Sequence, residues 1–276
     1  MGPRAVDAKT DQLSFDLAAD LPRLPGSLRP MLARPAPAPF DSARHLFEPA
    51  WGGRRALAFL EAAVTAEDAG GWLTADGRPS VRILDARGHD LLARLPELRA
   101  LSIRLDARSA VLDGELVAVD PEGRSDARRL RSRLLGNGDG PVAFLAFDLL
   151  YLDGRPLFAQ PLSRRRELLA EAIRRGPEIV VVPAIDGEGI ALHAAVVTQR
   201  LAGVRARVAT SPYLPGVRSV LWRSIRADET PADELSVVEP SRSDIASPAG
   251  PILAVIRRLP LDVGGQGDRR DDDPAV

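Results

Sequence analysis

The chain has 276 residues, of which 45% are hydrophobic, and it carries a formal net charge of −1. This size allows one large domain or two modest ones with ample core. The absence of cysteine excludes disulfides, thiolate metal sites and cysteine nucleophiles. Because no apolar run approaches the length of a membrane span and the first residues contain no hydrophobic signal region, we expect a soluble, cytoplasmic or nucleoid-associated protein without a membrane partner.

The charge is unevenly distributed along the chain. Residues 228–276 contain eleven acidic and five basic residues, whereas residues 1–227 carry a net charge of +5. A basic body with an acidic tail is compatible with nucleic-acid contact. The basic residues are almost all arginine, since the chain has a single lysine, Lys9.

Composition and turn signals predict three parts: a disordered leader over 1–27, a folded domain over 28–227, and a mostly disordered, acidic and proline-rich tail over 228–276. The stretch 34–39 (RPAPAP) should be extended, because proline does not fit a helix interior. Seven apolar runs have the composition and length of strands. They are 56–62, 81–84, 110–119, 142–152, 179–182, 204–209 and 220–225.

Helical periodicity predicts a helix over 163–175, with Ser163 as its cap and Gly176-Pro177 as its stop. Further helices are expected over 125–135 and 189–201. Strands dominate without regular βαβ alternation, which favours an α+β fold over a parallel doubly wound sheet. In the tail, the apolar run 251–261 (PILAVIRRLPL) predicts a short helix that docks on the body or on a partner.

Four stretches carry a set of motifs in a fixed order. They are HLFEPAWGGRRALAF (45–59), VLDGELVAVDPEGR (111–124), FLAFDLLYLDGRPLFAQPLSRRRELL (144–169) and LAGVRARVATSPYLPGVRSVLWRSIR (201–226). Together they resemble the adenylation domain of ATP-dependent DNA ligases, especially the bacterial type that includes the ligase module of end-joining ligase D. The resemblance implies an ATP-grasp-like nucleotidyltransferase fold, shared with mRNA capping enzymes, in which antiparallel sheets are flanked by helices.

The resemblance also implies a chemistry. In this family the first step attaches AMP from ATP to a motif lysine, with Mg²⁺ at the phosphates. Complete ligases add an OB-fold barrel after the adenylation domain, and we expect none here because the 49 tail residues are too few to build it.

The chain departs from the family pattern where that chemistry takes place. Ala50 stands at the position of the lysine nucleophile, and Gly52 and Ala202 replace two motif carboxylates. Arg207 and Ser224 replace motif lysines. An alanine side chain has no lone pair, and a guanidinium group stays protonated, so neither can attack phosphorus. The sequence therefore predicts no catalytic residue.

The resemblance assigns nucleotide binding to six residues: Glu48, Arg55, Glu115, Phe147, Arg207 and Arg226. Glu115 is also the predicted Mg²⁺ ligand, and a hydrogen-bonded carboxylate is the alternative. Phe147 either stacks on adenine or belongs to the core, and the arginines line an anion pocket. The arginine-rich stretches 128–133 and 164–166 face either phosphates or solvent, and solvated helix faces are the commoner case.

These observations predict an ATP-dependent DNA ligase-like adenylation-domain protein, linked to DNA repair and recombination, that does not form the enzyme–AMP intermediate. One alternative is a non-catalytic module that binds a DNA end or a partner in double-strand break repair. The other is an active ligase with an unorthodox nucleophile such as Lys9. The expected partners are nicked or broken duplex DNA and another repair protein. The family implies ATP and Mg²⁺ as cofactors, although the substitutions remove groups that hold them.

Overall fold

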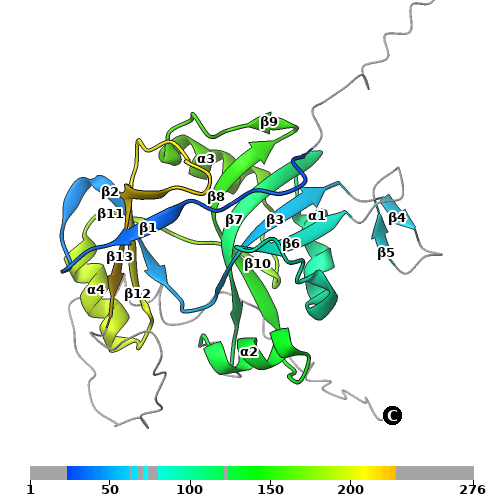
Figure 1. The fold of residues 1–276 in the computed structure, drawn as a ribbon, viewed down its shortest axis with the longest axis horizontal. Helices are drawn as coiled ribbons and strands as arrows, with labels where there is room; N and C mark the ends of the chain where they lie inside the picture. Colours follow the sequence, from blue (N-terminus) through cyan, green and yellow to red (C-terminus); the bar gives the residue numbers. More distant parts are fainter. Residues whose placement is uncertain (1–23, 63, 67–70, 74–79, 121–123, 228–276) are drawn as a thin grey trace, which may run out of the picture.

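The computed structural model describes residues 24–62, 64–66, 71–73, 80–120 and 124–227 (Figure 1). Two β-sheets form the body of the protein. The first has the strand order β1-β13-β12-β2-β11, and the second has the order β10-β8-β7-β3-β6, with β9 paired to β8. The first sheet consists of β1 (Leu32–Pro35), β13 (Arg218–Arg226), β12 (Gly203–Val208), β2 (Ser42–Ala50) and β11 (Ile185–Gly187).

The second sheet consists of β10 (Ile179–Val181), β8 (Val142–Leu152), β7 (Ser109–Ala118), β3 (Arg54–Glu61), β6 (Val81–Asp85) and β9 (Arg155–Pro156). Within both sheets the pairing is antiparallel except for β1 with β13 and β10 with β8. A separate hairpin pairs β4 (Val64–Ala66) with β5 (Gly71–Leu73). The mixed and mainly antiparallel sheets confirm the predicted α+β class.

Helices cover the outer faces of the sheets. The helix α4 (Gly189–Thr198) packs on β12 and β2, α3 (Leu162–Ala172) packs on β8, and α2 (Ala127–Leu135) packs on β7. Two short 3₁₀ segments, η2 (Leu92–Arg94) and η3 (Pro96–Ala100), lead into α1 (Leu101–Arg104). In the described part of the chain, no helix is long and apolar enough to cross a membrane.

The second sheet is buried on both faces, and this explains its apolar sequence. In β8, Leu145 and Phe147 belong to the core shared with the first sheet, whereas Phe144 and Ala146 pack on the other side with Leu101. Successive side chains on a strand point to opposite faces. A strand covered on both sides therefore reads as a continuous apolar run, as residues 142–152 do.

Several predicted elements need correction. The strand β2 was not predicted, because it begins with polar residues and contains Pro49. The helix predicted at 163–175 spans Leu162–Ala172, and Ser163 does not cap it: Pro161 is the N-cap, without a side-chain hydrogen bond. It ends before Gly176 because Ile173 is extended and bridges to Leu105.

The other two predicted helices are shorter than expected. The helix expected at 125–135 begins at Ala127, because Asp126 accepts hydrogen bonds from the first-turn amides of Arg128 and Arg129. The helix expected at 189–201 ends at Thr198, and Arg200 has a positive φ of 56°. The described residues do not include residues 1–23 of the predicted leader. They also do not include the tail 228–276, to which the run 251–261 belongs.

Candidate functional site

The pairing register of the first sheet brings the motif residues together. Ala50 on β2 lies opposite Gly203 on β12, which in turn lies opposite Arg226 on β13. Glu48 lies opposite Arg205 in the same way. Side chains of directly opposed residues in antiparallel strands lie on the same face of a sheet. The motif residues of β2, β12 and β13 therefore share one face.

The position that the motifs assign to the family's nucleophile is buried and apolar. Ala50 is 4% exposed, and its carbonyl accepts a hydrogen bond from the Ala202 amide at 3.0 Å. Gly52 has a φ of +78°, and a Cβ at that position would lie 3.3 Å from the Cβ of Ala202. Ala50, Gly52 and Ala202, which the motifs assign to the lysine and to two carboxylates, are thus neighbours, and none of the three has a functional group in its side chain.

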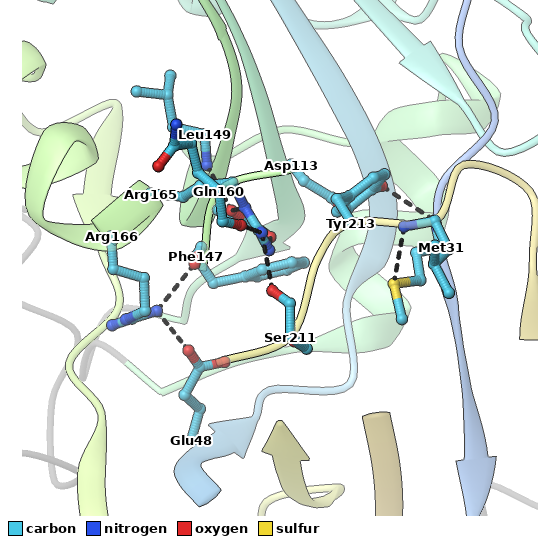
Figure 2. Close-up of polar contacts among 12 residues, drawn as sticks. Met31, Glu48, Asp113, Phe147, Leu149, Gln160, Arg165, Arg166, Ser211 and Tyr213 are labelled. Atoms are coloured by element: carbon cyan, nitrogen blue, oxygen red, sulfur yellow. Dashed lines mark hydrogen bonds and ion pairs between the residues drawn. The ribbon is translucent and has the colours of Figure 1, made fainter. Parts of the chain in front are cut away.

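Glu48 is held in a network of two guanidinium groups. Its carboxylate pairs with Arg166 from α3 and with Arg207 from β12. Arg166 also donates hydrogen bonds to the carbonyl of Phe147 at 2.8 Å and to that of Val182 at 2.6 Å. Figure 2 shows Arg166 between Glu48 and the backbone of Phe147. Glu48 therefore ties the first sheet to α3 and to the end of β8.

Phe147 does not present a free ring. The guanidinium carbon of Arg207 lies 4.1 Å from its ring centroid and that of Arg55 lies 4.6 Å away. Trp222 packs edge-on against the ring, which is only 5% exposed. Of the two predicted roles, stacking on adenine and core packing, the structure places this ring in the core beneath two cations.

Arg55 is fixed by Asp113 on the neighbouring strand. Its Nε and one terminal nitrogen donate to the two carboxylate oxygens of Asp113, each at 2.5 Å. The Tyr213 hydroxyl donates to the same carboxylate at 2.7 Å and accepts from the Met31 amide at 2.9 Å. Figure 2 shows Tyr213 between Asp113 and Met31. Arg55 thus has a carboxylate partner before any ligand arrives.

Glu115 is also engaged. Its Oε1 accepts a hydrogen bond from the Gly53 amide at 2.6 Å. A Cβ at Gly53 would lie 2.0 Å from the Leu116 carbonyl oxygen, so only glycine fits there. The described residues contain no group of three or more His, Asp or Glu side chains that could hold a metal ion.

A cavity of about 100 Å³ lies among these groups. Five of the six predicted nucleotide-binding residues line it, namely Glu48, Arg55, Glu115, Phe147 and Arg207. Arg226 is exposed at the end of β13 and does not line this cavity. Five of the six side chains named from the resemblance therefore converge on one cavity, and Arg226 is not among them.

A second hollow of about 240 Å³ adjoins the first. Arg55, Arg205 and Arg207 border both, and Arg218 and Trp222 line the second. Arg223 also borders it, but its register opposite Ala206 directs its side chain to the other face of the sheet. No acidic residue lines this second hollow within the described part of the chain.

Of the three arginines that border both hollows, Arg55 pairs with Asp113 and Arg207 pairs with Glu48, whereas Arg205 has no carboxylate partner among the described residues. Burial lowers the pKa of Arg207 to about 9. Burial also lowers the pKa of Arg205, with Glu115 opposing the shift and Arg55 adding to it. Arg205 has no hydrogen-bond or ion-pair partner among the described residues. Because an arginine remains protonated at neutral pH, Arg205 brings a partly buried positive charge that an anion would stabilise.

Several buried donors are unsatisfied as well. The indole nitrogens of Trp51 and Trp222 and the Nε of Arg207 have no acceptor among the described residues. Each orphaned N–H costs free energy, about 1–3 kcal/mol by the usual scale. All three are donors, which favours a ligand rich in acceptors.

The residues present do not fit ATP and Mg²⁺. Ligand pockets typically enclose about 300–1,000 Å³, whereas the cavity at Phe147 has about 100 Å³ and its aromatic face is covered by Arg207. Glu115, the predicted metal ligand, accepts a hydrogen bond from the Gly53 amide, and the other carboxylate of the cavity, Glu48, pairs with Arg166 and Arg207.

Sequence reasoning missed Arg166 and Arg205. Arg166 belongs to the stretch 164–166, for which the sequence favoured a solvated helix face. This prediction is wrong for two of the three residues, because the side chains of Arg165 and Arg166 are only 0% and 13% exposed. Alternation along β12 could have identified Arg205, because residues 203, 205 and 207 point to the same face.

The fold and the site together define the chain as a nucleotidyltransferase-type adenylation domain. Residues 75–225 match the family model of the ATP dependent DNA ligase domain, which is more than half of the chain. The chain therefore belongs to the ATP-dependent DNA ligase domain family. ATP and Mg²⁺ are used by this family in general.

Its relatives include the multifunctional end-joining ligases of mycobacteria. The "multifunctional non-homologous end joining DNA repair protein LigD" of Mycobacterium tuberculosis is 34% identical over 197 residues, which are 71% of this chain and 23% of that protein. LigD of Mycolicibacterium smegmatis is 31% identical over 199 residues, covering 72% and 24%. The chain spans about a quarter of the length of these relatives.

The fold agrees with a solved structure of the same kind. A mycobacterial DNA ligase D complexed with ATP and MES superposes with a TM-score of 0.59 at 32% identity, covering 73% of this chain and 60% of that one. The predicted nucleotidyltransferase fold is confirmed by this likeness.

Proposed function

We propose that this chain is a ligase-type adenylation domain that does not form an enzyme–AMP intermediate and that works in DNA repair or recombination as a non-catalytic component. The observation that carries the proposal is Ala50. The motifs assign this residue to the nucleophile position, and it lies at the end of β2, 4% exposed, with Gly52 and Ala202 beside it. No lysine is present in the described residues, so none of their side chains brings an amine to the cavity.

The neighbouring groups support the same conclusion. Arg207 stands where the family has a lysine, and it pairs with Glu48 and covers Phe147. An arginine in this position keeps the charge of the lysine but binds carboxylates and aromatic rings more firmly. The side chains that remain thus bind one another, where the family would bind a nucleotide.

The test is a nick-sealing assay with the full chain. A duplex with a single 5′-phosphorylated nick is incubated with ATP and either Mg²⁺ or Mn²⁺, beside a ligase D ligase domain as the active control. We expect no sealed product. ATP-dependent sealing would overturn the proposal, and loss of that sealing in Lys9→Ala would identify the leader lysine as the nucleophile.

A second function, binding of nucleic-acid phosphates, is favoured by the hollow that Arg205 and Arg218 border. Arg205 has no partner among the described residues, and Arg218 donates only to the Ala33 carbonyl, at 2.7 Å. Unpaired arginines beside orphaned N–H donors suit phosphate oxygens. The names of the mycobacterial relatives refer to end joining, so we propose nicked or broken duplex DNA as the polyanion.

Fluorescence anisotropy on labelled nicked duplex tests this function. Each phosphate contact contributes about 0.9 to the slope of log K against log salt. Arg205→Ala with Arg218→Ala should weaken binding and lower the slope by about 1.8 if both contact phosphate. The matched control replaces Arg128 and Arg131, two exposed arginines of α2, which packs on the other sheet. Equal losses of affinity in the two double variants, or no binding at about 50 mM salt, would refute phosphate binding at this hollow.

A further inference from the structure

The helix α4 carries an apolar face that nothing in the described residues covers. Leu192, Ala195 and Val196 of this helix are buried against the first sheet. On the outer side, Ile190 is 52% exposed and Val197 is 42% exposed.

These two residues share a face with Ala194, which is exposed between them. Positions i, i+4 and i+7 form one stripe along a helix. A helix on the surface of a domain normally turns polar side chains outward. An exposed apolar stripe along a helix is therefore a candidate contact surface.

The chain itself provides a matching segment. Residues 252–256 read Ile-Leu-Ala-Val-Ile and are followed by Arg257 and Arg258, in the tail outside the described residues. The rest of the tail is dominated by acidic residues, prolines and small polar residues. We infer that residues 252–258 dock on the outer face of α4, with the apolar run on the stripe of Ile190, Ala194 and Val197.

The point where the described chain ends favours this occupant. The Ala227 amide donates to the Ala202 carbonyl at 3.2 Å, just beyond the C-terminal end of α4. The His193 ring on α4 bonds the carbonyl of Arg226 at 2.7 Å. The tail therefore leaves the fold beside this helix.

The connection is long enough to reach the stripe. Residues 228–251 separate the exit from the apolar run. A connection of 24 residues can span up to about 80 Å, several times the length of about 15 Å that α4 covers. A tethered segment acts at an effective concentration on the order of millimolar, which a free partner seldom reaches.

Charge sets the direction of docking. Asp186 and Glu188 are exposed at the N-terminal end of α4. If the apolar run starts near the exit point at the C-terminal end and proceeds along the helix, Arg257 and Arg258 arrive at these two carboxylates. The segment is thus antiparallel to α4, with Ile252 near Val197 and Ile256 near Ile190.

The absence of cysteine makes the test direct, because every introduced thiol is unique. The full chain carrying Val197→Cys and Ile252→Cys is oxidised at low protein concentration, and the products are separated by non-reducing electrophoresis and mapped by peptide mass. The control pairs Ile252→Cys with Leu135→Cys, a position that is more exposed than Val197, at 61%, and lies on α2, which packs on the other sheet.

We expect an intramolecular disulfide in the 197/252 protein at a rate at least tenfold above that of the control. Equal rates in the two proteins would overturn the inference, and so would a disulfide between two chains, which would indicate a second copy on the stripe. As a second readout, Val255→Asp should speed hydrogen exchange of the 189–199 backbone amides. Unchanged exchange would also overturn it.

Discussion

The ion pair between Arg165 and Asp148 offers the sharpest test of how α3 is fixed to the core. Both side chains are 0% exposed, and the guanidinium donates to the two carboxylate oxygens at 2.7 and 2.8 Å. It also donates to the carbonyls of Gln160 at 2.5 Å and Ser211 at 3.0 Å. Removing one partner of such a pair leaves an uncompensated buried charge, which costs about 3–5 kcal/mol. Arg165→Met should lower the free energy of unfolding by that amount.

Urea denaturation measures the change, and the neighbouring Arg164→Ala is the control. Arg164 is half exposed and pairs only with Glu167 one turn along the helix, so its replacement should leave the urea midpoint unchanged. Burial raises the pKa of Asp148, and the hydrogen bonds from Arg165 oppose that rise. Without Arg165, Asp148 holds a proton in the folded variant that it releases in the unfolded chain. The loss in free energy of unfolding relative to the wild type should therefore shrink as the pH falls.

The double variant Arg165→Met with Asp148→Leu removes both charges. A buried pair replaced by apolar residues of similar volume is often neutral in stability, so this variant should recover at least half of the loss. A stabilising role of the ion pair is refuted if Arg165→Met costs no more than Arg164→Ala, or if removing Asp148 as well doubles the loss.

Three further predictions concern the site and its surroundings. ATP with Mg²⁺ at millimolar concentration should leave the melting temperature unchanged, because Arg207 covers Phe147; a ligand at 100 times its dissociation constant would add about 2.7 kcal/mol, so a clear upward shift contradicts the closed cavity. Gly53→Ala should prevent folding or strongly destabilise the protein, measured as yield and urea midpoint, since its Cβ would meet a backbone carbonyl at 2.0 Å; a native midpoint refutes this. Burial opposes ionisation of Asp85, but hydrogen bonds from Arg54 and from two backbone amides outweigh burial and lower the pKa of Asp85 from 3.8 to about 2. The ionised Asp85 therefore stabilises the fold above pH 3.8, and this contribution is lost as the pH falls towards 2. Asp85→Asn should therefore lose less stability than the wild type between about pH 5 and pH 2, and parallel losses would exclude this role.

Much of the fold follows from local sequence pattern. The run 142–152 is continuous and apolar because both faces of β8 are buried, and its predicted limits are those of the strand. The strand β2 has no such pattern: its first half is partly exposed and polar, and its conformation depends on pairing with β12 and β11. Long-range pairing of this kind leaves little trace in a single stretch of sequence.

The site was predictable from motifs, but its internal pairing was not. Five motif residues line one cavity, as their positions in the family implied. Arg166 lies 118 residues from Glu48, and only the fold shows that they pair. Likewise, the position of Arg207 over Phe147 depends on how β12 and β8 meet across the core. Sequence identifies the groups, and tertiary contacts decide whether they bind one another or a ligand.

Intact-mass measurement tests most directly whether a chain with Ala50 at the proposed nucleophile position can still bind AMP covalently. The purified full chain is incubated with ATP and Mg²⁺, denatured at alkaline pH, which preserves a phosphoramidate, and weighed beside an untreated sample. The predicted result is a single mass identical in both samples. A covalent adenylyl adduct on any side chain, with peptide fragmentation distinguishing Lys9 from residues 24–227, would contradict the proposed loss of AMP transfer.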